Sequence, residues 1–152
     1  MPDKNEIFEM YKQHRAGQDK YTYFLLATAA AAIAFAVQKT EGLLISWWLL
    51  PVAFAILFWG VSFYYGCKHI NWAQTATQAN YNLLQLNQGV HPQQPPHPQL
   101  AQAAVRGVES ALDSNVKNAQ FYAKWQFRTL VLGALFFISW RVLEMVRITC
   151  VA

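Results

Sequence analysis

The chain has 152 residues, of which 55% are hydrophobic, 15% are aromatic and only 13% are charged. The length suits one domain, but the composition is too apolar and too aromatic for a small soluble domain, so it favours an integral membrane protein. Lys and Arg exceed Asp and Glu, which gives a formal net charge of +4. In a membrane protein the distribution of basic residues is explained by topology. We therefore expect membrane lipid as the surroundings and no nucleic-acid partner.

Residues 1–20 are polar and mix acidic with basic side chains. A weak pattern of less polar residues at helical spacing predicts a short amphipathic helix. The mixture of charges and the lack of a clear cleavage site argue against a signal peptide. We expect this segment to be retained and cytoplasmic.

The seventeen residues from Tyr21 to Val37 carry no charge, which is the minimum length for a transmembrane helix. This run is rich in alanine. Small residues four apart let helix backbones approach closely where lipid supplies no hydrophobic drive. The predicted helix-packing residues are Ala27, Ala30, Ala31 and Ala34.

A second uncharged segment, Leu43 to Tyr65, has two tryptophans near one end and two tyrosines at the other. Aromatic residues at both ends are typical of a transmembrane helix with its interfacial belts. The short segment Gln38–Gly42 is long enough only to join antiparallel helices. Residues 21–65 therefore predict a transmembrane hairpin.

Residues 66–128 predict a cytoplasmic antiparallel helical hairpin, or stalk, whose tip is the proline-rich segment 89–98. On each side of the tip, mostly apolar residues recur at alternating steps of three and four, which places them on one face of a helix. Asn115 lies on this face, where a buried amide can fix the register of pairing. The predicted assembly seam comprises Trp72, Ala76, Ala79, Leu83, Leu86, Val105, Val108, Leu112, Asn115, Ala119 and Tyr122.

Residues 129–152 contain a third apolar segment. Only the twelve residues Thr129–Trp140 are without charge, a length that also suits a re-entrant or interfacial element. Arg128 and Arg141 flank this run and can extend their charged ends outward, so we expect a third transmembrane helix.

Orientation follows from the number of basic residues in each loop. Four lie in the N-terminal segment and five in the 66–128 segment, whereas the membrane hairpin loop has only Lys39. The positive-inside rule places the N-terminus and the stalk in the cytoplasm. Three crossings put the C-terminus outside, and two leave it inside.

Three charged residues near the third apolar segment share one helix face: Arg141, Glu144 and Arg147. Ionisable residues at membrane depth often mark a functional path, so we regard them as candidate membrane-path charges. The alternative is that the helix leaves the membrane here and Arg141 forms an ordinary interfacial ion pair with Glu144.

No sequence motif indicates catalysis, a cofactor or a metal site. The chain has no phosphate-binding glycine-rich loop and no paired-carboxylate motif. Its histidines and cysteines do not form the closely spaced pairs of a zinc site. We therefore expect no enzyme, no cofactor and no bound metal.

The predicted fold class is an all-α integral membrane protein of three long helices with a cytoplasmic antiparallel stalk. Such a small bundle has little interior for a site, which favours a homo-oligomer. We expect a channel or membrane-perturbing effector gated by a cytoplasmic signal. The alternative is an accessory or anchoring subunit whose stalk docks a soluble partner protein. The layout resembles that of small membrane effector subunits of bacterial defence systems, which implies a bacterial inner membrane.

Overall fold

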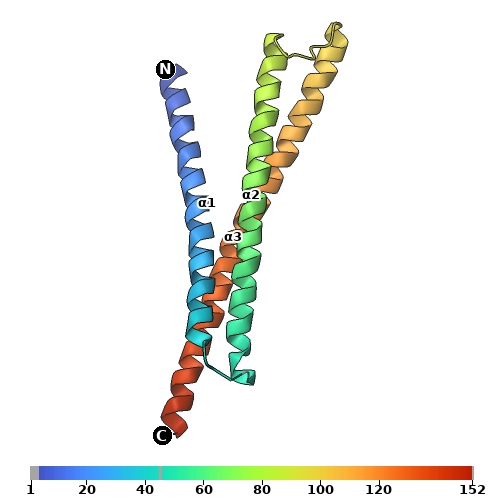
Figure 1. Cartoon of the computed structure of the whole chain (residues 1–152). Coiled ribbons are helices and arrows are strands. Elements are labelled where there is room, and N and C mark those ends of the chain that lie inside the picture. The colour runs from blue at the N-terminus through green and yellow to red at the C-terminus, as the bar shows by residue number, and fades with distance from the viewer. Residues whose placement is uncertain (1–3, 45, 152) are drawn as a thin grey trace. The chain divides into compact units, whose positions relative to one another are not determined.

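The computed structural model describes residues 4–44 and 46–151. These residues form an all-helical protein that is 90% helix and has no strand. Its α-helices are α1 (Lys4–Thr40), α2 (Leu50–Gln88) and α3 (Pro98–Val151), and the one-turn 3-10 helix η1 (Trp47–Leu49) leads into α2 (Figure 1). Each α-helix contains a segment long and apolar enough to cross a membrane. The prediction of an all-α chain with three helices of membrane length is therefore confirmed.

The first two helices differ in their limits from the prediction. No break separates the polar residues before position 21 from the apolar run, because α1 continues from Lys4 to Thr40. The next helix begins at Trp47 and not at Leu43. Gly42 explains part of this difference, since its φ of 77° is a left-handed conformation that ends a helix and favours glycine. The connection thus extends from residue 41 to residue 46.

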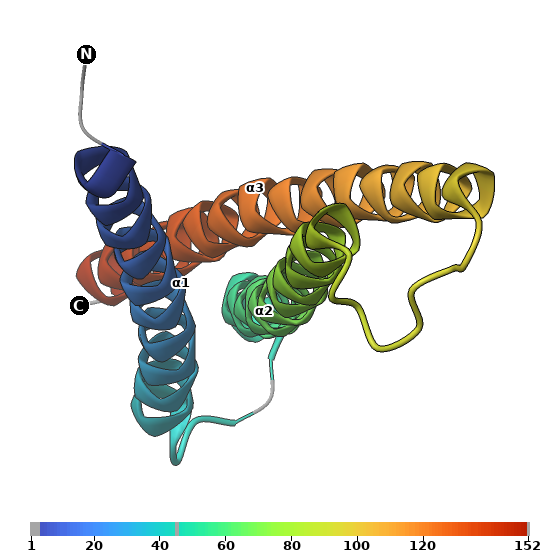
Figure 2. The same cartoon turned by 90° about the horizontal axis from the view of Figure 1, so that it is seen from above.

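Helix α2 ends in a standard glycine cap. Gly89 has a φ of 72°, its N–H donates to the Leu86 carbonyl at 3.2 Å, and the N–H of Val90 donates to the Gln85 carbonyl at 3.0 Å. This pair of bonds satisfies carbonyls that the last helical turn leaves free. Val90 is consequently outside the helix and 63% exposed. The irregular connection that follows is clear in Figure 2, and α3 begins at Pro98, which has no N–H to leave unpaired.

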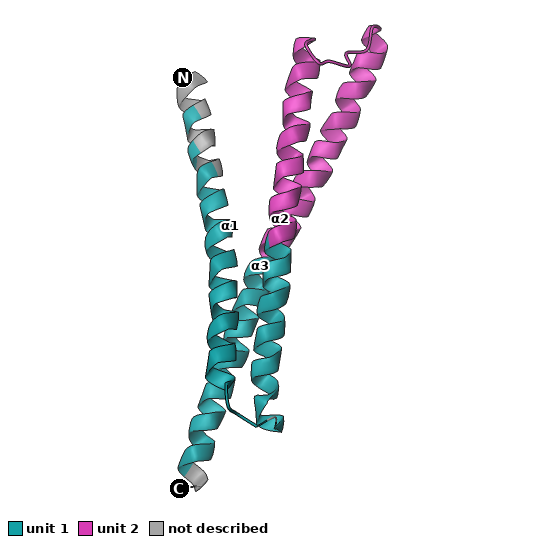
Figure 3. Ribbon diagram, viewed as in Figure 1, with its two compact units in different colours: residues 1–66, 125–152 teal, residues 67–124 magenta. Residues whose placement is uncertain are grey.

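The structure divides into two compact units (Figure 3). Unit 1 comprises Met1–Gly66 and Trp125–Ala152, and unit 2 comprises Cys67–Lys124. Helices α2 and α3 therefore contribute to both units, whereas α1 belongs to unit 1 alone. These limits lie close to the boundaries between the membrane and stalk segments that the sequence predicts.

The core of unit 1 combines small residues with tryptophan. Its buried cluster contains two alanines from α1 and α2, Val52, and two tryptophans from α2 and α3. Aromatic rings at the edge of the cluster contact one another, and Phe58 stacks on Phe136 with ring centroids 5.4 Å apart. Interleaving of large and small side chains brings the three helices of this unit close together. The buried cluster consists of Ala36, Val52, Ala55, Trp59 and Trp140.

The packing face of α1 differs from the predicted one. Ala27, Ala30, Ala31 and Ala34 are all exposed in the chain. The face that packs inside unit 1 contains instead Thr22, Leu25, Ala29 and Ala36, which are at most 5% exposed. Alanine occupies seven of the ten positions from Ala27 to Ala36, so small-residue spacing holds for several faces at once and cannot indicate which face points inward.

In unit 2, α2 and α3 contact each other along the predicted seam. All eleven predicted seam residues are buried or half-buried, and Ala76, Leu86 and Ala119 are the most buried at 7–9% exposure. Asn115 is half-buried among them. Alternating steps of three and four residues therefore place a mainly aliphatic contact between the two helices.

Candidate functional site

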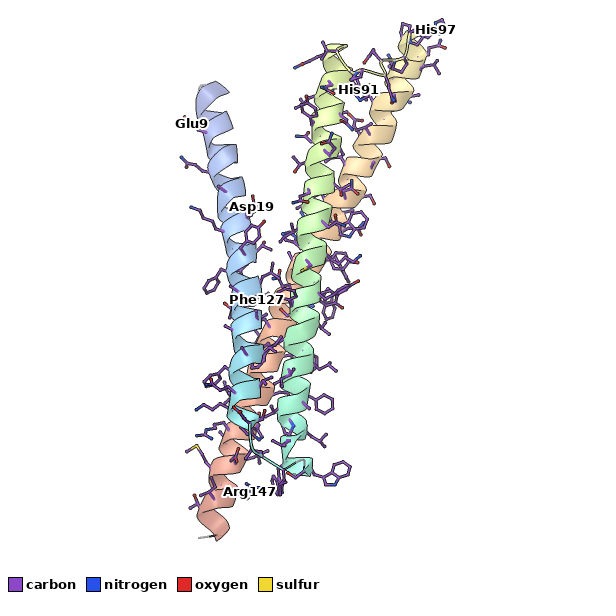
Figure 4. The ribbon with its side chains drawn as sticks, viewed as in Figure 1. Glu9, Asp19, His91, His97, Phe127 and Arg147 are labelled. Carbon is purple, nitrogen blue, oxygen red and sulfur yellow. The ribbon has the colours of Figure 1, made fainter. Side chains whose placement is uncertain are left out.

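A cavity of about 300 Å³ lies at one end of unit 1, where the connection between α1 and α2 meets the last turns of α3. Two of the three predicted charges, Glu144 and Arg147, line it. Figure 4 labels Arg147 in this region of α3. The full lining consists of Gly42, Leu43, Leu44, Ser46, Trp48, Leu49, Trp140, Leu143, Glu144 and Arg147.

The three predicted charged residues differ in exposure and in their contacts. The Glu144 side chain is only 15% exposed, and its Oε1 lies 3.7 Å from Nη2 of Arg147, whose side chain is 43% exposed. Arg141 is exposed and does not line the cavity. The alternative ion pair between Arg141 and Glu144 is therefore wrong for the described structure, in which Glu144 pairs with Arg147.

Helical geometry explains this arrangement. Glu144 follows the buried Trp140 by four residues and so shares its inward face, whereas Arg141 is rotated about 100° away from Trp140. Trp140 also separates the cavity from the core, because it lines the cavity and belongs to the buried cluster. Behind the two charges, unit 1 is closed by packed side chains.

A second polar region lies between α2 and α3 inside unit 1, and none of its residues is among the predicted site residues. Trp59 Nε1 donates to the Leu130 carbonyl at 3.2 Å, and Ser62 Oγ donates to the Gln126 carbonyl at 2.8 Å. Ser62 is fully buried. Thr129 Oγ1 also donates to the Gln126 carbonyl at 3.1 Å, within α3. These bonds fix the axial register of α2 relative to α3.

The side chain of Gln126 is the least satisfied group in this region. It is 1% exposed, and its Nε2 has no hydrogen-bond partner among the described residues. It packs against Gly66, where an added Cβ would lie 2.6 Å from Gln126 Nε2 and 2.6 Å from Leu26 Cδ2. Because Gly66 has no side chain, the Gln126 amide fits between the helices. An unpaired buried donor of this kind costs about 1–3 kcal/mol.

A signal for this region is present in the sequence. Val52, Ala55, Trp59, Ser62 and Gly66 follow one another at steps of three and four, as the seam residues do, and all are buried. On α3 the same spacing continues from Ala119 and Tyr122 through residues 126, 129 and 133. Extending the heptad pattern beyond the predicted stalk would have located the contact.

The histidines do not form a metal site in the described residues, which contain no group of three or more His, Cys, Asp or Glu side chains placed to hold a metal ion. His69 Nδ1 lies 2.8 Å from the Ala119 carbonyl in unit 2. Because a carbonyl only accepts, this nitrogen is the donor. His91 accepts a bond from the N–H of Gln93 at 3.1 Å in the connection between α2 and α3.

Two separate polar regions are thus available to unit 1: the open cavity with its acid–base pair, and the closed contact around Gln126. Only the cavity can receive a ligand without displacement of packed side chains. No family model matches the chain, and no curated protein and no solved structure matches it.

Proposed function

We propose that this chain is a non-enzymatic integral membrane protein that self-assembles and acts as a channel or membrane-perturbing effector gated through its stalk. The observation that carries the proposal is the amount of apolar surface that the chain leaves uncovered. In the most apolar stretch of each candidate span, only 22%, 28% and 17% of the residues are buried. Lipid or further copies must cover the rest.

Self-association is favoured by the exposed alanines of α1. Ala27, Ala30, Ala31 and Ala34 offer a face of small side chains within a candidate span. In lipid, helices associate through close backbone approach more than through burial of apolar area. The face that is not used inside the chain is therefore suited to an α-helix of a second copy.

A route for ions would have to lie between copies, because Trp140 and the packed cluster close the interior of a single unit 1. Arg141 is exposed at the edge of the third apolar segment, and no described residue forms an ion pair with it. A charge that faces lipid is unfavourable, although less so at the edge of the hydrocarbon core than at its centre. A water-lined interface between copies would remove most of this cost.

Assembly can be tested by enlarging the exposed alanines. Ala30→Leu and Ala34→Leu should reduce oligomer size in detergent, measured by light scattering, because they prevent close approach on α1. Ala53→Leu is the matched control, since Ala53 is exposed on α2 outside this face. A protein that is monomeric before substitution, or an oligomer that tolerates both α1 variants, contradicts self-assembly through these alanines.

Conduction is tested by ion flux and dye release from liposomes. Wild-type oligomers should permeabilise the vesicles, and Arg141→Ala should change the flux without changing oligomer size. A stable oligomer that carries no current and releases no dye, with soluble partners added, removes the channel proposal. The accessory-subunit alternative would then take its place, and it is favoured by Tyr81 and Leu84, two apolar side chains of unit 2 that are 55% and 52% exposed.

We further propose a bacterial inner-membrane location, with the N-terminus and unit 2 in the cytoplasm because basic residues are concentrated in these two segments. Cys67 is exposed and serves as a natural reporter. An impermeant thiol reagent should label it only from the cytoplasmic face, whereas a Lys39→Cys variant should react from the outside. Reversed labelling contradicts the orientation.

A further inference from the structure

The cavity at the end of unit 1 has walls of two chemical kinds. Most of its surface is apolar and comes from Leu43, Leu44, Trp48, Leu49, Trp140 and Leu143. Its charged groups are the carboxylate of Glu144 and the guanidinium of Arg147. An apolar cavity with one acid and one base is complementary to an amphiphile that carries both charges and has an apolar body.

Glu144 and Arg147 do not form a close ion pair. Their 3.7 Å separation is longer than a hydrogen bond, and no described residue donates a hydrogen bond to the Glu144 carboxylate. A carboxylate that is only 15% exposed is stabilised by N–H donors. Arg147, more exposed at 43%, keeps a fork of donors that suits a phosphate.

We propose that this cavity binds the headgroup of a zwitterionic phospholipid with a primary ammonium group, of the phosphatidylethanolamine kind. The ammonium donates to the Glu144 carboxylate and the phosphate accepts from the Arg147 guanidinium. Leucine and tryptophan side chains of the lining contact the glycerol and the upper acyl chains.

The exposed tryptophans beside the cavity indicate that it lies at the headgroup level of the membrane, which fits this ligand. Trp47 is 85% exposed and Trp48 is 52% exposed beside the cavity, and exposed tryptophans are enriched at the headgroup level of a membrane. The inference rests on membrane insertion of unit 1, but it is independent of channel activity. A choline headgroup has no N–H to offer Glu144, and a glycerol headgroup has no positive charge.

Binding is measured on the delipidated full-length protein in detergent by native mass spectrometry. The probes are short-chain phosphatidylethanolamine, phosphatidylcholine and phosphatidylglycerol, together with free phosphoethanolamine. The ethanolamine lipid should bind about tenfold more tightly than either other lipid, as expected for one hydrogen bond between charged groups. Equal binding of the three lipids overturns the proposal, and tighter binding of free phosphoethanolamine than of the lipid assigns the cavity to a soluble ligand instead.

Charge variants then test which residue binds the ammonium group and which binds the phosphate. Glu144→Gln should abolish the preference for the ethanolamine lipid, whereas Arg147→Gln should weaken binding of all three lipids about tenfold. Arg141→Gln makes the same charge change on an exposed part of α3 outside the cavity and should bind like wild type. Retained preference in Glu144→Gln, or an equal effect of Arg141→Gln, contradicts the assignment.

A variant without any charge change keeps the test decisive if one of the charge variants loses helicity. Leu143→Trp leaves both charges in place and fills part of the cavity, so it should lower binding of the ethanolamine lipid. Unchanged binding in this variant means that the lipid is held elsewhere. Vesicle flux is recorded on the same samples, so loss of lipid selectivity and loss of permeation can be told apart.

Discussion

The contacts between α2 and α3 are built differently in the two units. In unit 1 they include phenylalanine, tryptophan, serine, glycine and a buried glutamine, and some of the side chains donate to backbone carbonyls. In unit 2 they are mainly alanine, leucine and valine, and they include a hydrogen bond from His69 to the Ala119 carbonyl. A hydrophobic contact is effective in water, whereas helices in lipid need close packing and hydrogen bonds. The contrast is what the proposed membrane and stalk roles require.

The largest expected effect is a charge placed in the aliphatic contact of unit 2. Leu86→Asp puts a carboxylate at a position that is 8% exposed, and it should destabilise this unit by about 3–5 kcal/mol. Thermal unfolding followed by circular dichroism measures the loss. Leu84→Asp, on the same helix at 52% exposure, is the control and should cost little. Equal melting of the two variants would refute the aliphatic contact.

In unit 1 the strongest effect should come from adding one methyl group. A Cβ at Gly133 would lie 2.5 Å from Nε1 of Trp59, whose ring is buried and held by its bond to Leu130. Gly133→Ala should therefore destabilise unit 1 by about 1–3 kcal/mol. Gly60→Ala meets nothing within 4 Å and should stabilise α2 by up to about 1 kcal/mol. The two variants should change the free energy of unfolding in opposite directions, which is measured by unfolding in detergent.

A smaller effect of favourable sign is expected at Gln126. Replacing it with methionine keeps the length of the side chain and removes a buried donor that has no partner among the described residues. Stability in detergent should rise by about 1 kcal/mol or stay unchanged. The backbone acceptor for Ser62 is retained. A clear loss of stability in Gln126→Met would mean that the amide makes an interaction outside a single chain.

The smallest effect should come from Ser62→Ala. It removes one bond to the Gln126 carbonyl, which still accepts from Thr129, so the cost should be about 0.5–1 kcal/mol. Ser139→Ala is the control, because Ser139 is exposed and bonds only within its own helix. If both variants unfold alike, the bond between helices contributes nothing measurable.

Periodicity alone accounts for much of the fold. Apolar runs and heptad spacing predict three membrane-length helices, and they place Leu83, Leu86 and Leu112 on the contact face. Spacing could not select the inward face of α1, because alanine occupies seven of the ten positions from Ala27 to Ala36. It also could not choose between Arg141 and Arg147, each three residues from Glu144, since the loop residues Gly42–Leu44 that complete the cavity carry no chemical signature.

The bonds between α2 and α3 make unequal demands on the two helices. Trp59, Ser62 and His69 each supply a side-chain donor, while Leu130, Gln126 and Ala119 supply only backbone carbonyls. A substitution on α2 removes a donor, but any residue on α3 still presents the acceptor. Mutational tolerance should therefore be asymmetric. A deep mutational scan should find narrow residue choice at positions 59, 62 and 69, and choice limited only by size at 119 and 130.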